Sequence, residues 1–547
     1  MTVEPSLGPA ALAVLIARLT GVAEEMGAVL RRGAFSPNIK ERADCSAALF
    51  TADGTLLVQA EHIPVHLGSM PASVRAAIDS LGDQVGPGLQ VIVNDPFAGG
   101  THLNDVTLVA PCHLPDGRLV GWAANRAHHA DIGGSAPGSL PADATEIQQE
   151  GLRIPPMRFT SEVRELLIAA SRTPEERRGD IDAQVGSNVV GLQRLAELAG
   201  EPLDEVVDYG ERRMRAAVAE LPDGRWEAID VLDSYGSAPD QQEPTTIRVA
   251  VTIDGERISF DFGGTDPQRR GNVNAVEAVT VSAAVFALRC AVDPTIPANG
   301  GGLRAVEVIA PAGSVVAAQP PVAVGAGNVE VSQRVADVCL AALAGAAPDR
   351  IGAASQGTMN NLLIGSDGWV YYETVAGGQG GRPGREGMSG IHTCMTNTSQ
   401  ADPQLGSGVP GQSGIHTCMT NTRNTPIEAL ERTFPMRVLR YRLRRGSGGA
   451  GLAPGGEGIE RDLQVLEDCT VSLITERRVS RPWGLAGGEP GAVGENWLLP
   501  GGDEARAERL PDKCTIRLEA GDVLRMLTPG GGGWGTQGGR RSTQPLC

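Results

Sequence analysis

Residues 94–105 read Asn-Asp-Pro-Phe-Ala-Gly-Gly-Thr-His-Leu-Asn-Asp, and residues 125–134 read Asn-Arg-Ala-His-His-Ala-Asp-Ile-Gly-Gly. Together the two stretches contain three of the chain's eight histidines and three aspartates: His102, His128, His129, Asp95, Asp105 and Asp131. Imidazole and carboxylate groups are typical ligands of a divalent ion such as Zn, Mn or Fe. The same pattern also fits a polar turn whose histidines are only hydrogen-bonded. No HExxH or CxxC motif decides between the two interpretations.

The strands predicted around these residues would bring them together. An apolar run at 89–93 precedes the first stretch and another at 106–113 follows it, and both favour β-strands. The turn sequence Pro-Asp-Gly at 115–117 then sends the chain back along a third strand, 118–125. This arrangement delivers His128 beside the glycine-rich loop, so two ligands from the loop and one from a neighbouring strand end can form a metal corner.

The rest of the chain predicts a mixed α+β fold in several layers, rich in strands and glycine turns, with helices near the N-terminus and in the middle. Apolar residues at three- and four-residue steps predict an amphipathic helix at 9–32, and another helix follows Ser69. Further helices are expected at 161–221, 275–292 and 330–347, and strands at 47–51, 225–233, 245–253 and 256–262. From 434 onward short strands alternate with glycine runs, which we interpret as turns because no helix follows them to form a phosphate site.

We divide the chain into four parts: a metal-site region at 1–160, a central α/β region at 161–430 with an inserted loop at 399–422, a β-rich region at 431–535, and a disordered tail at 536–547. The loop is suggested by a duplication, because the ten residues 389–398 recur unchanged at 413–422. A repeat protein needs about three copies or more. We therefore expect a local tandem duplication with its spacer, 399–412, in a surface loop.

Composition narrows the possible functions. A net charge of −18 over 547 residues argues against a nucleic-acid partner. Lys40 and Lys513 are the only lysines, and neither ends a Walker A loop, so ATP binding by that route is not expected. Nine cysteines spread singly are typical of a reduced intracellular protein, and the apolar run at 10–19 is too short to cross a membrane. We expect a cytoplasmic protein without a membrane anchor.

Several long motifs occur in one order: Phe35-Ser-Pro-Asn-Ile-Lys-Glu-Arg with Asp44, His62-Ile-Pro-Val-His66-Leu-Gly-Ser-Met, residues 94–105, His128-His-Ala-Asp-Ile-Gly-Gly, Glu150-Gly-Leu-Arg-Ile-Pro-Pro, Asp261-Phe-Gly-Gly-Thr, Gly271-Asn-Val-Asn, Thr420-Asn-Thr-Arg-Asn-Thr-Pro-Ile-Glu428 and Ser447-Gly-Gly-Ala-Gly. In these motifs, over about residues 9–535, the sequence resembles the B (β) subunits of the hydantoinase B/oxoprolinase family, the ATP-dependent cyclic-amide hydrolases. The family motif around Thr420 occurs once, so the first copy of the duplication and its spacer resemble an insertion.

The resemblance implies a partner, an A-type subunit of the actin/sugar-kinase class that binds ATP, and hence a hetero-oligomer. In the implied mechanism this partner phosphorylates the amide oxygen of a small cyclic amide, and the metal site of the B-type subunit delivers water to the activated carbon. A divalent ion lowers the pKa of bound water to about 7. Carried over by motif, the ligands of one Zn, Mn or Fe ion are Asp44, His102, Asp105 and His128.

The roles of the other candidate residues have less support from the sequence. Glu150 or Asp131 is a candidate proton carrier. Neighbouring residues of a strand point to opposite faces, so His129 would contact substrate or support a ligand and would not itself bind the ion. Asp44 precedes the predicted strand at 47–51, where the sequence alone favours a surface or capping carboxylate, and only the resemblance makes it a ligand.

Two other functions remain open. The chain could be a subunit of an ATP-dependent ketone carboxylase of the acetone or acetophenone type, a related branch with the same metal corner. It could also be a non-catalytic, metal-stabilised scaffold for the ATPase partner, which would need no open coordination position. Assays of the reconstituted pair with 5-oxoproline, hydantoins, or a ketone plus bicarbonate distinguish the three.

Overall fold

The computed structural model describes residues 7–60, 64–293, 295–382, 416, 418–420 and 422–536. His62 of the quoted motif, the first copy of the duplication, the spacer 399–412 and residues 537–547 of the predicted tail lie outside these residues. Within the described part of the chain, no helix is both long enough and apolar enough to cross a membrane. Helices and four sheets confirm the predicted α+β class.

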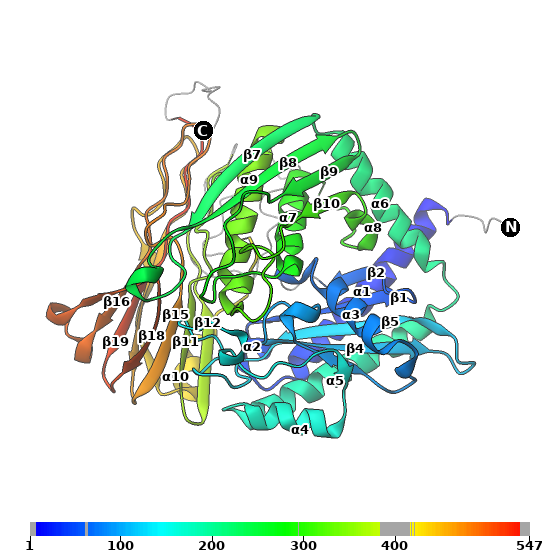
Figure 1. The fold of residues 1–547 in the computed structure, drawn as a ribbon, viewed down its shortest axis with the longest axis horizontal. Coiled ribbons are helices and arrows are strands. Elements are labelled where there is room, and N and C mark those ends of the chain that lie inside the picture. The colour runs from blue at the N-terminus through cyan, green and yellow to red at the C-terminus, as the bar shows by residue number, and fades with distance from the viewer. Residues whose placement is uncertain are drawn as a thin grey trace.

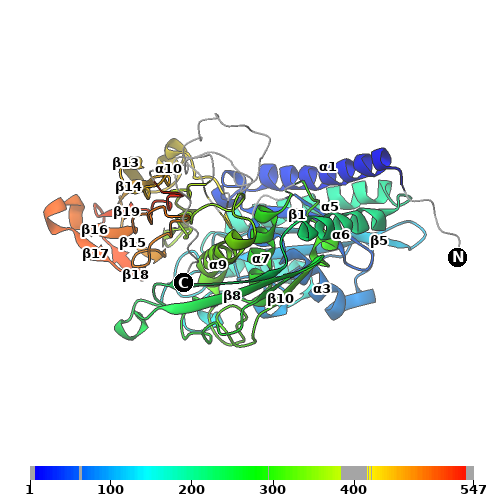
Figure 2. The same ribbon diagram turned by 90° about the horizontal axis from the view of Figure 1, so that it is seen from above.

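The N-terminal region is a six-stranded antiparallel sheet between helices (Figures 1 and 2). Its strands, in spatial order, are β2 (Leu56–Ala60), β1 (Cys45–Thr51), β5 (Leu119–His128), β4 (Asp105–His113), β3 (Val91–Val93) and β6 (Met157–Arg158). Alternate residues of β1 point to opposite faces, so Ala47 and Leu49 pack with α1 (Pro9–Gly33), whereas Ala48 and Phe50 pack with α3 (Met70–Leu81). The short helix α2 (Pro37–Lys40) leads from α1 into β1. The predicted helices at 9–32 and after Ser69 are confirmed.

The middle of the chain forms a second layered unit (Figure 1). Helices α4 (Ser161–Ala170), α5 (Pro174–Glu197) and α6 (Leu203–Ala219) fill the predicted helical stretch. The four-stranded sheet that follows has the order β10 (Val306–Ile309), β9 (Arg257–Asp261), β8 (Thr245–Asp254), β7 (Gly224–Leu232). Beneath it lie α7 (Glu277–Ala291) and α9 (Ser332–Ala346), which are buried on nearly every side and share the largest apolar core. Between these two helices the chain also forms the short helix α8 (Gly300–Leu303) and a π-helical turn, Gly327–Val331.

Two further sheets and α10 (Ile427–Thr433) make up the C-terminal region, on the left in Figure 1. One sheet has the order β12 (Trp369–Thr374), β11 (Asn361–Ser366), β15 (Cys469–Ile474), β18 (Lys513–Leu518). The other has the order β13 (Met436–Arg444), β14 (Gly458–Val465), β19 (Val523–Leu527), β16 (Glu495–Leu499), β17 (Glu508–Leu510). Leu473 of the first sheet and Leu463 of the second belong to one apolar core, so the two sheets pack against each other.

The glycine runs of this region do more than turn the chain. Segments 377–381, 448–456, 484–491 and 530–533, which we call the glycine bundle, lie side by side and hydrogen-bond through their backbones. Gly531 N donates to Gly456 O, Gly456 N donates to Gln379 O, and Gly378 N donates to Pro529 O. A Cβ atom at Gly378 would collide with the carbonyl oxygen of Gly456. The segments therefore approach more closely than any side chain would permit, an arrangement that the expectation of turns did not include.

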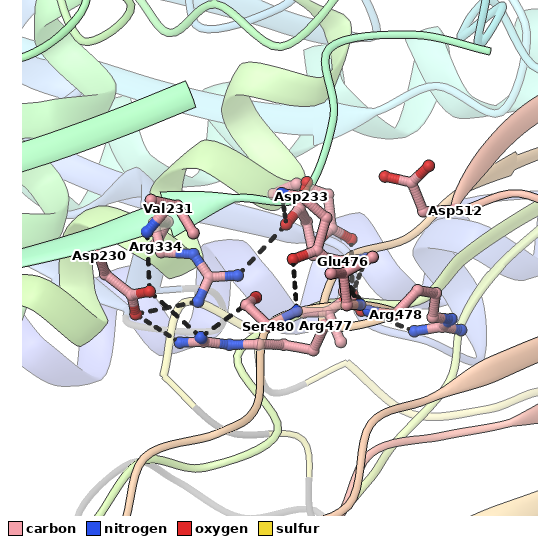
Figure 3. A network of polar contacts seen from close by, with 12 residues as sticks. Asp230, Val231, Asp233, Arg334, Glu476, Arg477, Arg478, Ser480 and Asp512 are labelled. Atoms are coloured by element: carbon pink, nitrogen blue, oxygen red, sulfur yellow. Dashed lines mark hydrogen bonds and ion pairs between the residues drawn. The ribbon is translucent and has the colours of Figure 1, made fainter. Parts of the chain in front are cut away.

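A buried network of charges connects the central unit to the C-terminal region (Figure 3). Arg334 of α9 lies 3.1 Å from Asp230 of β7 and 3.3 Å from Glu476, which follows β15. The neighbouring Arg477 also pairs with Asp230, at 2.7 Å. Asp233, just after β7, accepts hydrogen bonds from successive backbone N–H groups of the segment 478–480. The network fixes the position of the chain around the π-helical turn, which forms part of the candidate site.

Candidate metal centre

The register of one hairpin assembles the predicted metal corner. Asp105 opens β4 and stands directly opposite His128, the last residue of β5. His102 comes from the loop before β4, three residues from Asp105. That loop contains a left-handed residue, Gly99 (φ 94°), and a Cβ atom there would lie 2.6 Å from the carbonyl oxygen of Ala72. Only glycine fits this position, and the glycine-rich loop can therefore fold back to bring His102 over the strand end.

The three side chains enclose one point. His102 Nε2 lies 3.1 Å from Asp105 Oδ1, His128 Nδ1 lies 3.3 Å from the same oxygen, and the two nitrogens are 3.1 Å apart. All three residues are buried. The centre of such a triangle is about 1.8 Å from each atom, so an ion at the usual distance of about 2.0–2.2 Å would sit just outside its plane. Asp105 Oδ1 has no hydrogen-bond donor in the described part of the chain, as expected of a ligand oxygen.

The electrostatics of the cluster suit a cation. Burial opposes ionisation of Asp105, yet the charge of His102 and the close imidazoles of His102, His128 and His66 hold the pKa of that carboxyl well below its usual range. Burial lowers the pKa of His128 to about 3, so its imidazole is neutral, as a metal ligand must be. Burial also opposes protonation of His102, but the Asp105 carboxylate outweighs it and raises the pKa of that imidazole. The cluster therefore attracts a positive charge, and its donor set fits a divalent ion.

The second oxygen of Asp105 is held in place from three directions. Thr101 Oγ1 donates to Asp105 Oδ2 at 2.6 Å, and Asn328 Nδ2 donates to it at 3.2 Å. His66 Nε2 lies 3.4 Å from the same oxygen, while its Nδ1 is 2.9 Å from Ser46 Oγ. These contacts fix the carboxylate plane, so Asp105 Oδ1 faces the two ligand histidines.

Asp44 lies next to this cluster but is not one of the three residues whose ligand atoms all lie within 4.8 Å of one another. Its carbonyl oxygen accepts a hydrogen bond from His128 N, and its side chain lines the same pocket as His66 and His128. The side chain is buried, contrary to the surface position that the sequence alone favoured. Burial raises the pKa of Asp44 to about 7; Arg42 opposes this shift and Asp105 adds to it.

The remaining predicted residues lie in different surroundings. The ring of His129 is 2.8 Å from Gln184 Oε1 of α5, whereas His128 belongs to the metal cluster, in agreement with the strand argument. Asp131 accepts the backbone N–H groups of Gly133, Gly138 and Arg172 and pairs with the Arg172 guanidinium at 2.9 Å. These contacts indicate that Asp131 holds the loop in place. They do not support the predicted role of Asp131 as a proton carrier.

Glu150 is buried, and its carboxylate accepts the N–H groups of Val324 and Gly325, just before the π-helical turn. Burial raises the pKa of Glu150 to about 7 despite these two hydrogen bonds, and the charge of His102 acts on it as well. A carboxyl group with this pKa is close to half-protonated at neutral pH. Its chemistry is therefore compatible with the predicted proton carrier.

A small pocket opens beside the cluster. Its walls combine the polar side chains of Asp44, His66, His128, Asn328, Tyr372, Thr374, Thr420 and Thr422 with the apolar ones of Val65, Val329 and Met359. The Tyr372 ring stacks on His128, with centroids 4.8 Å apart. Thr420 and Thr422, at the end of the predicted inserted loop 399–422, are buried and line this pocket.

Sequence reasoning missed several of these residues. His66 stands in a quoted motif, but nothing in that motif marked it as a contact of Asp105. Asn328 and Tyr372 lie more than 200 residues from Asp105, and neither stands in a pattern that points to a site. Thr422 belongs to the duplicated segment, whose repetition suggested a loop. The signal available was that the second copy continues into a family motif.

Comparison with known proteins identifies the family of the chain. The family profile described as Hydantoinase B/oxoprolinase matches residues 8–405 and 404–537. An uncharacterised protein of Methanocaldococcus jannaschii is 39% identical over 94% of this chain and 88% of its own length. The 5-oxoprolinase 1 of Arabidopsis thaliana is 36% identical over 96% of this chain, which spans only 42% of that protein. A protein of Pseudomonas sp. named for the B component of a D-/L-hydantoinase is 30% identical over 97% of this chain and 90% of its own length.

Two solved structures share the fold. An ATP-dependent caprolactamase from Pseudomonas jessenii superposes with a TM-score of 0.85 at 26% identity, covering 97% of this chain and 92% of the other. A nucleotide-free acetone carboxylase superposes with a TM-score of 0.84 at 18% identity, covering 96% of this chain and 76% of the other, a likeness of fold alone. From the profile and the relatives together, the chain is a member of the hydantoinase B/oxoprolinase family.

Proposed function

We propose that this chain is the B-type subunit of an ATP-dependent hydrolase of cyclic amides, working with an ATP-binding A-type partner. The observation that carries the proposal is the buried His102–Asp105–His128 triangle at the wall of a small pocket. The pocket walls supply both apolar surface and hydroxyl groups, which a ring amide requires.

The relatives support the reaction class. The 5-oxoprolinase, the D-/L-hydantoinase component and the ATP-dependent caprolactamase are all named for hydrolysis of ring amides. The chain spans 42% of the Arabidopsis protein, so a further part of that protein has no counterpart here. The sequence contains no Walker A lysine, and we assign ATP binding to the partner subunit.

Each proposed residue has a distinct task. His102, Asp105 and His128 would hold one divalent ion, with Asp44 as a fourth donor from the pocket wall. The bound ion would supply Lewis-acid activation of water at neutral pH. Thr101 and His66 would keep Asp105 in its ligand orientation, and Tyr372 would keep the ring of His128 in place by stacking. Glu150, buried beside His102, is the proposed proton carrier, and His129 supports the strand end through Gln184.

The proposal is tested by activity of the separated and combined subunits. The isolated chain should show no ATP turnover with 5-oxoproline or hydantoin, and the mixture with the A-type partner should show turnover that depends on the ring amide. Substrate-dependent ATP hydrolysis by the isolated chain would contradict the two-subunit assignment. Turnover of acetone plus bicarbonate, without any turnover of ring amides, would show that the complex is a carboxylase and not a hydrolase. A complex without either activity would point to the scaffold.

A further inference from the structure

Asn328 carries a hydrogen-bond acceptor that no residue in the described part of the chain uses. The residue lies in the π-helical turn Gly327–Val331, is 4% exposed, and its side chain lines the pocket. Its Oδ1 atom has no hydrogen-bond donor among the described residues. Buried polar atoms in proteins nearly always have a partner, so a lone acceptor at a pocket wall indicates a missing ligand or water. π-Helical turns are also frequent at functional sites.

The orientation of the Asn328 amide is fixed by its neighbour. The other end of the amide lies 3.2 Å from Asp105 Oδ2, a carboxylate oxygen that also accepts the Thr101 hydroxyl at 2.6 Å. The atom facing Asp105 must therefore be the NH₂ group, and the oxygen must be the atom left without a donor. A flipped amide would place two acceptors against each other. The unpaired oxygen thus belongs to a residue of the pocket wall, beside the ligand carboxylate.

The other side chains of the pocket wall differ from Asn328 in the hydrogen bonds that they can make. Thr374 and Thr422 contribute hydroxyls, which can donate as well as accept and lie 2.7 Å from each other. Val65, Val329 and Met359 are apolar and offer no hydrogen bond. A ring amide carries its N–H next to its carbonyl group. Because Asn328 adjoins the ligand Asp105, one small ring can place its carbonyl near the cluster and its N–H against Asn328.

We propose that Asn328 Oδ1 accepts a hydrogen bond from the ring N–H of the substrate, and that this contact restricts the enzyme to ring amides with a free N–H. The inference rests on the proposed function and narrows its substrate class. It places ring ketones and N-substituted rings outside that class. Asn328 is in this respect a specificity-determining residue, distinct from the groups proposed to hold the ion.

The test compares each lactam with a ring of the same size in which CH₂ replaces N–H. The pairs are 5-oxoproline with 3-oxocyclopentane-1-carboxylate, and caprolactam with cycloheptanone. Calorimetry on the metal-loaded full chain, alone and with its partner, gives the affinity ratio within each pair without any turnover. The wild type should prefer the lactam by about 10- to 100-fold, because the ketone leaves a buried acceptor unpaired. Asn328→Ala should lower that ratio to about one.

Thr101→Val is the matched control, since Thr101 also donates to Asp105 Oδ2 but does not line the pocket. This variant should keep the wild-type ratio while losing the same kind of support for Asp105. Elemental analysis would establish that each variant holds its metal. The inference fails if Asn328→Ala keeps the preference, or if Thr101→Val loses it equally.

Asn328→Ser is a second variant in case the alanine variant does not fold, and it should also lower the ratio. Even without variants, a wild type that binds lactam and ketone equally overturns the role of Asn328 while leaving the proposed function intact. A wild type that binds neither 5-oxoproline nor caprolactam, alone or with its partner, overturns the proposed function and this inference with it.

Discussion

Replacing Lys513 by methionine should destabilise the protein more than almost any surface substitution. The Lys513 ammonium group is completely buried, 2.6 Å from Glu476 and 2.8 Å from Asp512. Methionine fills a similar volume but carries no charge. The substitution would leave two buried carboxylates without the cation that lies between them.

The structure sets the size of the effect. Removing one partner of a buried ion pair costs about 3–5 kcal/mol, because the remaining charge stays buried. Glu476 retains Arg334 at 3.3 Å, and Asp512 still accepts the Ser234 hydroxyl at 2.6 Å. These remaining contacts place the expected loss of unfolding free energy in the lower half of the range, about 3–4 kcal/mol.

The chain supplies its own control, because its only other lysine, Lys40, is exposed. Lys40→Met should change stability by no more than about 0.5 kcal/mol. Urea unfolding followed by tryptophan fluorescence would compare the midpoints of both variants with the wild type. Equal midpoints for the two lysine variants would refute the argument.

The pH dependence gives a second check. Burial raises the pKa of Glu476 to about 7 even though Lys513 opposes the shift, so removing Lys513 should raise that pKa further. A carboxyl group whose pKa is higher in the folded state than in the unfolded state stabilises the fold while it is protonated. This stabilisation is complete below the unfolded pKa of about 4.5 and is lost as the pH rises through the folded pKa. The loss of unfolding free energy caused by Lys513→Met should therefore be larger at pH 8 than at pH 6. A penalty that grows on acidification would contradict this assignment.

Four further outcomes are expected. Protein purified without chelator should contain close to one divalent ion per chain by elemental analysis, and His102→Ala should lose it; metal retained by that variant would contradict the ligand assignment. Wild-type protein should release the ion as the pH falls from 7 to 5, because protons compete with the ion for His102, whose pKa is raised, and for Asp44, whose pKa is raised to about 7; a metal content that stays constant over this range would argue against the site. Gly531→Ala in the glycine bundle should lower the free energy of unfolding by about 1–3 kcal/mol or more. In the same melting experiment Gly186→Ala on α5, with open space around it, should leave that free energy unchanged or raise it by up to about 1 kcal/mol. Deletion of 399–422 joins the first copy to Arg423 and yields the same chain as deletion of 389–412, so melting temperature and metal content should be unchanged; a melt several degrees lower would show that the extra segment is packed.

The His102–Asp105–His128 cluster could be predicted from the sequence because its geometry is local. A short hairpin with a Pro-Asp-Gly turn sets Asp105 opposite His128, and His102 is only three residues from Asp105. The long helices were predictable for a similar reason, since 9–32 and 275–292 carry strong apolar patterns over many turns. Local pattern therefore determines the cluster and the elements that frame it.

The pocket wall could not be predicted in this way. The contact between Asn328 and Asp105 spans 223 residues, and the stacking of Tyr372 on His128 depends on how the first C-terminal sheet docks. Glycine runs are ambiguous for a physical reason. The missing side chain permits a turn and close packing alike, and only the neighbouring segments decide between them.

The glycine bundle has a consequence for how genes of this kind can change. Every single-base change in a glycine codon that alters the residue introduces at least a Cβ atom, and at Gly378 or Gly531 that atom would enter a neighbouring backbone. No residue that a single-base change can introduce at these two positions therefore fits. Variation has to arise where whole segments can be added or lost between the fixed glycines. The ten residues 389–398, repeated at 413–422, lie in such an interval, between Gly381 and Gly448.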